Sequence, residues 1–247
     1  MIRISVVVFL CSVILQPLHA QVGATKFLIH GSYSIPTGKF GETLGDGAEL
    51  TNRLGFDPGD DVGLAKPGFG LGLEFSNTVL TDGLDWLISA KWLVNPTDVA
   101  GITDEFEDEL GDTVDVEYEN GNWINIPIFT GFKYTLHITD DVGIFGSLQA
   151  GLNITRQASR TAIVEGSVVE QTTFKFLANF GLEAGVGFEL YKRYHLGFRY
   201  LNLGQPQYAG TRTMDPTFFP EIPRREMPIE GDQRSVRMFL IVLGYHI

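Results

Sequence analysis

Residues 174–190 alternate between two kinds of side chain. Every second residue from Phe174 to Leu190 is apolar, and the residues between them are mostly charged, polar or glycine. A repeat of two places successive side chains on opposite faces of a β-strand. The segment is therefore predicted to be a strand with one apolar face and one polar face that is unusually rich in glycine.

The same alternation recurs in seven more segments. They are Phe27–Ile35, Phe69–Phe75, Leu84–Val94, Ile124–Tyr134, Val142–Ile154, Tyr194–Tyr200 and Phe239–Ile247. The connections alternate between long loops (residues 36–66, 96–122, 155–172 and 205–233) and short turns (76–83, 137–141 and 191–193). Long loops on one side and short turns on the other are typical of outer-membrane barrels. The predicted fold is all-β, an eight-stranded antiparallel up-and-down transmembrane β-barrel.

The glycine-rich face separates this prediction from a soluble alternative. A soluble β-sandwich or lipocalin-like barrel would also alternate, but its apolar face would lie inside. A packed core needs bulky side chains, which Gly181, Gly185 and Gly187 cannot supply on the opposite face. The continuous apolar face, with aromatic residues near the strand ends, is therefore expected to point outward into lipid.

Residues 1–20 have the order of parts of a secretory signal peptide. Arg3 precedes an apolar run from Ile4 to Leu15, and the segment ends at Ala20. The run is shorter than the roughly 20 residues of a transmembrane helix, so cleavage is expected, leaving 21–247 as the barrel. The only cysteine, Cys11, lies inside this run after Leu10, so neither a lipid anchor nor a disulfide is expected. The predicted location is the outer membrane of a Gram-negative bacterium.

The charge balance is acidic. Without residues 1–20, the chain has 17 Lys and Arg against 30 Asp and Glu, a net charge of −13. Such a balance argues against nucleic acid as a partner. Outer-membrane lipid and lipopolysaccharide are the expected surroundings, and no cofactor is expected.

Three segments carry a family resemblance. They are Gly-Ser-Tyr-Ser-Ile-Pro-Thr-Gly-Lys-Phe at 31–40, Ile-Asn-Ile-Pro-Ile-Phe-Thr-Gly-Phe-Lys-Tyr at 124–134 and Leu-Gln-Ala-Gly-Leu-Asn-Ile at 148–154. The chain resembles the small outer-membrane barrel family that includes the OmpA transmembrane domain and OmpX, particularly its "outer membrane protein β-barrel" branch. The resemblance implies a gate whose salt bridges rearrange to pass small ions.

Several charged residues fall on the predicted inner face. An eight-stranded barrel has a lumen only wide enough for side chains, so these charges should pair with one another. The principal candidates are Glu74, Lys91, Lys133, Glu183 and Arg199, together with Lys26, Asp85, Lys175 and Glu189. Glu183 and Arg199 are expected to form an ion pair. A static, charge-filled lumen is the alternative to a gate.

Three histidines also fall on the inner face. His30, His195 and His246 lie on strands that become neighbours when the barrel closes. His195 and His246 are expected near the short-turn end and His30 nearer mid-strand, and no cysteine or tight spacing supports ligation. They are interpreted as ordinary lumen histidines, and no metal site is predicted.

Two of the predicted loops suggest contact with partners. Residues 98–119 contain ten acids and no Lys or Arg; Asp104, Glu105, Glu107, Asp108 and Glu109 form their centre. They could bind divalent cations or hold them near lipopolysaccharide phosphates, although the regular spacing of a dedicated calcium loop is missing. Phe218 and Phe219 stand between prolines, where they could contact a surface protein partner or pack on the barrel rim.

No catalytic motif was found, so the chain is predicted not to be an enzyme. The nearest approach is His30 with Ser32 or Ser34, all on the inner face and away from lipid. The predicted function is a structural or surface-interaction role. A narrow pore or carrier for small ions or apolar solutes is the alternative, favoured by the inward Met238, Leu240 and Val242. A lipid-modifying barrel enzyme is the second alternative.

Overall fold

The structure of the chain is a computed structural model that describes residues 25–42, 63–79, 81–98, 116–215 and 226–247. The predicted signal peptide, the five central acids from Asp104 to Glu109, and the pair Phe218 and Phe219 lie outside these described residues. Within them, no helix is long and apolar enough to cross a membrane.

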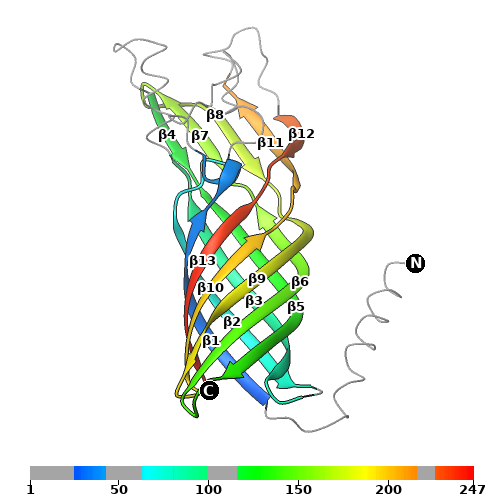
Figure 1. Cartoon of the computed structure of the whole chain (residues 1–247). Coiled ribbons are helices and arrows are strands. Elements are labelled where there is room, and N and C mark those ends of the chain that lie inside the picture. Colours follow the sequence, from blue (N-terminus) through cyan, green and yellow to red (C-terminus); the bar gives the residue numbers. More distant parts are fainter. Residues whose placement is uncertain (1–24, 43–62, 80, 99–115, 216–225) are drawn as a thin grey trace, which may run out of the picture.

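Eight antiparallel strands close into a barrel (Figure 1). They are β1 (Thr25–Pro36), β2 (Gly68–Thr78), β3 (Leu84–Pro96), β5 (Asn122–His137), β6 (Val142–Arg156), β9 (Leu177–Leu190), β10 (Tyr194–Asn202) and β13 (Arg237–His246). Each pairs with the next in this order, and β1 pairs with β13 to close the circle. The predicted fold class, strand number and order are confirmed.

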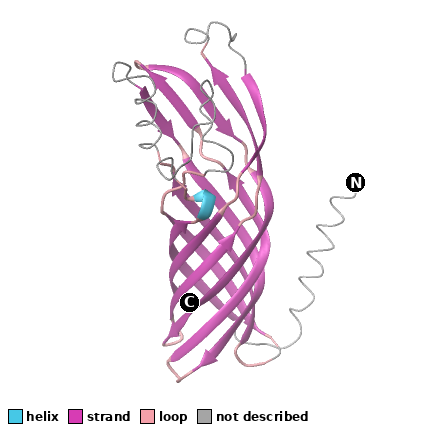
Figure 2. Ribbon diagram, turned by 45° about the horizontal axis from the view of Figure 1, so that its top comes forward, coloured by secondary structure: helices cyan, strands magenta, loops and turns pink. Residues whose placement is uncertain are grey.

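The barrel wall continues as a second sheet beyond one end. We call this the outer sheet; it comprises β4 (Val116–Asn120), β7 (Arg160–Val164), β8 (Ser167–Phe174), β11 (Gln207–Met214) and β12 (Glu226–Gln233). Its order, β12-β11-β8-β7-β4, repeats that of β13, β10, β9, β6 and β5. Figures 1 and 2 show that it extends the wall lengthwise and remains open. The opposite end, where short turns join the strands, is called the short-turn end.

The outer sheet corrects the prediction of long loops at three places. Residues 155–172 contain β7 and most of β8, residues 205–233 contain β11 and β12, and β4 lies in residues 96–122. The alternation also does not run unbroken through 174–190, because Phe174 ends β8 and Leu177 begins β9. Lys175 consequently lies in the connection and is exposed, so its placement in the lumen was wrong.

The exterior of the barrel is an apolar belt. Leu71, Leu148 and Val186 are 60–70% exposed, although each lies within a barrel strand. Aromatic pairs stand near both ends of the belt, such as Tyr194 with Tyr245 and Tyr33 with Phe69. Burial in β6 and β9 alternates residue by residue, as expected for one face to the outside and one to the lumen. An apolar band flanked by aromatic girdles is typical of transmembrane barrels.

A 3₁₀-helix after β1 positions one more core residue. This helix, η2 (Gly38–Phe40), begins where β1 ends, and the Phe40 side chain is fully buried against the top of the barrel. Gly63 and Ala65 donate backbone hydrogen bonds to Lys39 and Phe40, so the chain is held over the lumen on both sides of residues 43–62. Residues 38–41 and 63–65 therefore close part of the barrel mouth at the outer-sheet end.

Candidate functional site: a filled lumen

Arg199 occupies the centre of the lumen and joins two carboxylates. Its Nη1 lies 2.9 Å from Glu183 Oε1, and its Nη2 lies 3.0 Å from Glu74 Oε2. Glu74 comes from β2, Glu183 from β9 and Arg199 from β10, so the contact crosses the barrel interior. All three side chains are at most 2% exposed. The expected pair between Glu183 and Arg199 is therefore present, and Glu74 is an additional partner.

Lys91 supplies a second cation to Glu183. Its Nζ lies 2.8 Å from Glu183 Oε2 and also donates to Ser89 Oγ at 3.0 Å. Ser89 donates to Gln149 Oε1, and Gln149 Nε2 donates back to Glu183 Oε1. Ser89 and Gln149 thus belong to a site for which the sequence indicated only their inward position in the alternation.

Lys133 connects this group to the short-turn end. Its Nζ lies 2.9 Å from Glu189 Oε1, with Asp85 Oδ2 at 3.9 Å and Glu74 Oε1 at 4.0 Å. Asp85 is also paired with Lys26 Nζ at 3.3 Å. Lys133 is buried, whereas the Lys26 side chain is 35% exposed at the short-turn end. Lys133 thus shares its charge among three carboxylates.

These residues form what we call the central network. Its charged members are Glu74, Asp85, Glu183 and Glu189 with Lys26, Lys91, Lys133 and Arg199. The four acids equal the four bases in number. Burying a charge without a partner is costly, so this balance explains how so many ionised groups share a narrow interior. The five principal candidates named from the sequence, Glu74, Lys91, Lys133, Glu183 and Arg199, all belong to it.

An apolar plug fills the lumen beside the central network and extends to the outer sheet. Its larger members are Phe40, Leu93, Trp123, Phe129, Leu201, Leu203, Tyr208, Val236, Met238, Leu240 and Val242. Trp123 packs edge-on against Phe40 and Tyr208, with ring centroids 5.3 and 5.5 Å apart. Trp123 Nε1 donates to the Gly63 carbonyl, and the Tyr208 and Thr155 hydroxyls lie 3.0 Å apart. The polar tips of the aromatic residues are therefore satisfied, and the plug is a packed core.

The inward apolar residues of the last strand belong to this plug. Met238, Leu240 and Val242 are at most 1% exposed. Phe40 and Trp123 had not been predicted as lumen residues, because Phe40 follows the strand pattern in a loop and Trp123 lies at a strand end. Only the fold of residues 38–41 and 63–65 over the mouth brings them together.

The inner-face histidines and serines are buried in the lumen. His30, His195, Ser32 and Ser34 are at most 7% exposed. Ser34 Oγ accepts a hydrogen bond from Asn95 Nδ2 at 2.8 Å, so it is held within the wall. The nearest approach to a His and Ser pair on β1 therefore faces away from the apolar belt. His246 is 9% exposed near the short-turn end, next to Glu189.

The described geometry defines a closed eight-stranded barrel with an apolar exterior and a lumen filled by a charge network and an apolar plug. No protein-family model matches the sequence, and no curated protein matches it. Solved structures with similar folds include Neisserial surface protein A, which is 9% identical, with 92% of this chain and 99% of that protein covered and a TM-score of 0.48. OprG, an outer membrane protein from Pseudomonas aeruginosa, is 11% identical, covering 91% and 97%, with a TM-score of 0.45. A major outer membrane protein from Thermus thermophilus is 11% identical, covering 91% and 100%, with a TM-score of 0.46.

Proposed function

We propose that this chain is an integral barrel of the bacterial outer membrane with a structural or surface-interaction role, exported by the predicted signal peptide at residues 1–20. The apolar belt supports the membrane setting, because water would not solvate side chains such as Leu71 and Leu148 without penalty. Outer-membrane lipid and lipopolysaccharide are the proposed surroundings of the belt.

The filled lumen is the observation that carries the proposed role. The apolar plug and the central network together fill one narrow barrel, and they meet where Lys91 lies 5.8 Å from the Phe129 ring and Leu240 pairs with Arg199. A solute would have to displace packed rings and separate buried ion pairs to pass. The barrel is therefore proposed to serve as an anchor, and its function is assigned to the end that carries the outer sheet.

The outer sheet is the proposed interaction surface. It projects the strands beyond the barrel, and Val168 on β8 and Phe176 after it are each 51% exposed. Phe176 is covered on one side by the Arg156 guanidinium, 4.8 Å from the ring centroid. We include two sequence-based proposals for this end: divalent cations at the acidic residues 98–119, and a surface protein partner at Phe218 and Phe219.

Planar-bilayer recording tests the proposed role against the pore or carrier alternative. The reconstituted barrel should show no steady open channel. Steady channels that disappear in Glu183→Gln or Arg199→Met would overturn the proposal and assign conduction to the central network. A lipid A modification assay on the purified barrel tests the second alternative, a lipid-modifying enzyme. The burial of His30 and Ser32 within the lumen supports a negative result.

Cysteine labelling on intact cells tests which end faces outward. The predicted mature chain has no cysteine, so Ser167→Cys, at the exposed β7–β8 turn, provides a single site. A membrane-impermeant maleimide should label this variant. The matched control is Asp140→Cys, exposed in the turn between β5 and β6 at the other end, which should remain unlabelled until the cells are broken. The reverse pattern would invert the proposed orientation.

A further inference from the structure

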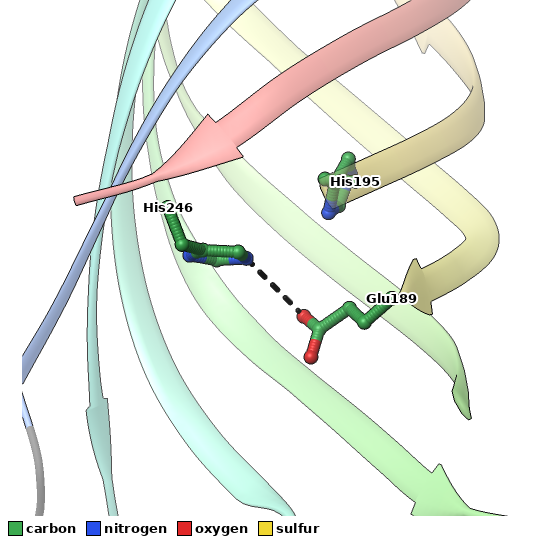
Figure 3. A group of neighbouring side chains, drawn as sticks. All are labelled: Glu189, His195 and His246. Atoms are coloured by element: carbon green, nitrogen blue, oxygen red, sulfur yellow. Dashed lines mark ion pairs between the residues drawn. The ribbon is translucent and has the colours of Figure 1, made fainter. Parts of the chain in front are cut away.

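We propose that Glu189, His195 and His246 form a binding site for a transition-metal cation of the zinc class at the short-turn end of the lumen (Figure 3). Such a site was not predicted from the sequence. The sequence pointed to three inner-face histidines, His30, His195 and His246. In the structure, the cluster consists of His195, His246 and the carboxylate of Glu189, without His30. The proposal concerns only this end of the lumen and is independent of what the outer sheet binds.

Strand register brings the three side chains together. His195 on β10 is directly paired with Glu189 on β9 and, on its other side, with Gly244 on β13. His246 follows Gly244 by two residues on β13 and therefore projects from the same face. The two imidazole ring centroids lie 6.1 Å apart. Closure of the barrel thus converges three ligands from three adjacent strands.

The ligand atoms would need to approach one another by up to about 1.5 Å to hold a cation. One ligand atom from each residue lies within 4.8 Å of the others, and His246 Nε2 is 3.6 Å from Glu189 Oε1. Zinc holds nitrogen and oxygen ligands at about 2.0–2.2 Å in a tetrahedron, which separates neighbouring ligand atoms by roughly 3.3 Å. A small rotation of the Glu189 and His246 side chains closes this difference. Figure 3 shows these two side chains pointing toward each other.

The imidazoles also have unused ligand atoms. Both ring nitrogens of His246 and Nδ1 of His195 are buried and have no hydrogen-bond partner among the residues that the structure describes. Buried polar groups are nearly always satisfied, so unpaired nitrogens on two neighbouring imidazoles need an explanation. A cation bound between the rings would take one nitrogen from each. The His195 ring is held in place by stacking on Phe145, with centroids 4.5 Å apart.

The donor set identifies the class of cation. Two imidazoles and one carboxylate suit Zn²⁺, Ni²⁺ or Cu²⁺, whereas Ca²⁺ and Mg²⁺ prefer oxygen ligands. Three protein ligands leave a fourth position for water, as in open zinc sites. The Glu189 and His246 side chains are 9% and 7% exposed, so each keeps a small contact with solvent.

Two neighbouring cations oppose a bound metal and can be accommodated. Lys133 Nζ contacts Glu189 Oε1, and Arg199 Nη2 lies 3.4 Å from His195 Nε2. Lys133 also lies near Asp85 and Glu74, so it retains carboxylate neighbours when Glu189 turns to the metal. Arg199 retains its pairs with Glu74 and Glu183 when the long contact to His195 is lost. A bound cation would link β9, β10 and β13 and stabilise the closed barrel.

Calorimetric titration of the untagged, folded barrel with Zn²⁺ tests the proposal. A polyhistidine tag would itself bind zinc and must be absent. We expect one Zn²⁺ per barrel, a rise in the thermal unfolding temperature with Zn²⁺, and no comparable effect of Mg²⁺. Co²⁺ in place of Zn²⁺ should give the visible absorption of a four-coordinate site, which reports on the ligands without any activity assay.

Variants decide whether these residues are the ligands. His246→Gln and Glu189→Gln should each weaken Zn²⁺ binding at least tenfold. His137→Ala, which removes an exposed histidine on β5 near the same end, is the matched control and should bind as before. His246→Gln lies at the end of the last strand, so circular dichroism should show an intact barrel. No stoichiometric binding by the parent barrel, or binding unchanged in His246→Gln, would overturn the proposal.

Discussion

Arg199 reaches Glu183 diagonally across the β9–β10 ladder, because the residue directly opposite Arg199 is Gly185. A Cβ atom at position 185 would lie 3.1 Å from Arg199 Cγ and 2.7 Å from Ser147 Oγ. The glycine therefore provides the space in which the arginine side chain crosses the lumen. This relationship explains why a glycine-rich face and a charged face are the same face of the barrel.

Replacing Glu183 should destabilise the barrel strongly. In Glu183→Gln, Arg199 and Lys91 both lose a buried carboxylate, and leaving a buried charge uncompensated costs about 3–5 kcal/mol. Urea unfolding in lipid vesicles, followed by tryptophan fluorescence, measures the free energy of unfolding. The control is Asp98→Asn, which removes a pair with Lys66 whose side chain is 47% exposed, and should cost about 0–1 kcal/mol. Equal effects of the two substitutions would contradict the network described here.

Gly72 and His30 should behave as a coupled pair. A Cβ at Gly72 would lie 2.3–2.4 Å from ring atoms of His30, so Gly72→Ala should overpack the lumen and cost about 1–3 kcal/mol. Adding His30→Ala should recover most of that loss. Gly31→Ala is the control, because no atom of the described residues lies within 4 Å of a Cβ there, and its unfolding free energy should not fall. A double variant as unstable as the sum of its parts would show that the two positions are independent.

Removing Phe40 should weaken the barrel without opening it. Phe40 is fully buried against Trp123, and Phe40→Ala should cost about 3–5 kcal/mol through the cavity it leaves. The central network below remains intact, so bilayer recordings should still show no steady channel. A stable variant that conducts would mean that the apolar plug alone closes the lumen.

A charge on the apolar belt should be costly only where lipid surrounds it. Leu148 lies near the middle of β6 and is 70% exposed, so Leu148→Arg should cost about 2–4 kcal/mol in vesicles. Asp140→Arg, in the exposed turn before β6, should change the unfolding free energy far less. Similar values for both variants would argue that the belt does not contact lipid.

The eight barrel strands could be predicted from the sequence because side chains on a strand alternate strictly between two faces. Apolar residues such as Leu148 and Val186 were assigned to the exterior, and Glu183 and Arg199 to the lumen, from this repeat alone. The outer sheet could not be predicted in the same way. The pairing of β7 with β8 shifts register between Ala162 and Ile163, and neither strand has a clean alternation, so residues 155–172 looked like a loop.

The pairing of lumen charges required the closed tertiary structure. Glu74 and Arg199 are 125 residues apart, and they meet only because β2 and β10 face each other across a narrow interior. Likewise, His246 reaches Glu189 and His195 because β13 pairs with β10 as well as with β1. By itself, the sequence determined which side of each strand faces inward, since that depends on a local repeat. The tertiary structure decided which inward groups touch, since that depends on the register in which distant strands close the barrel.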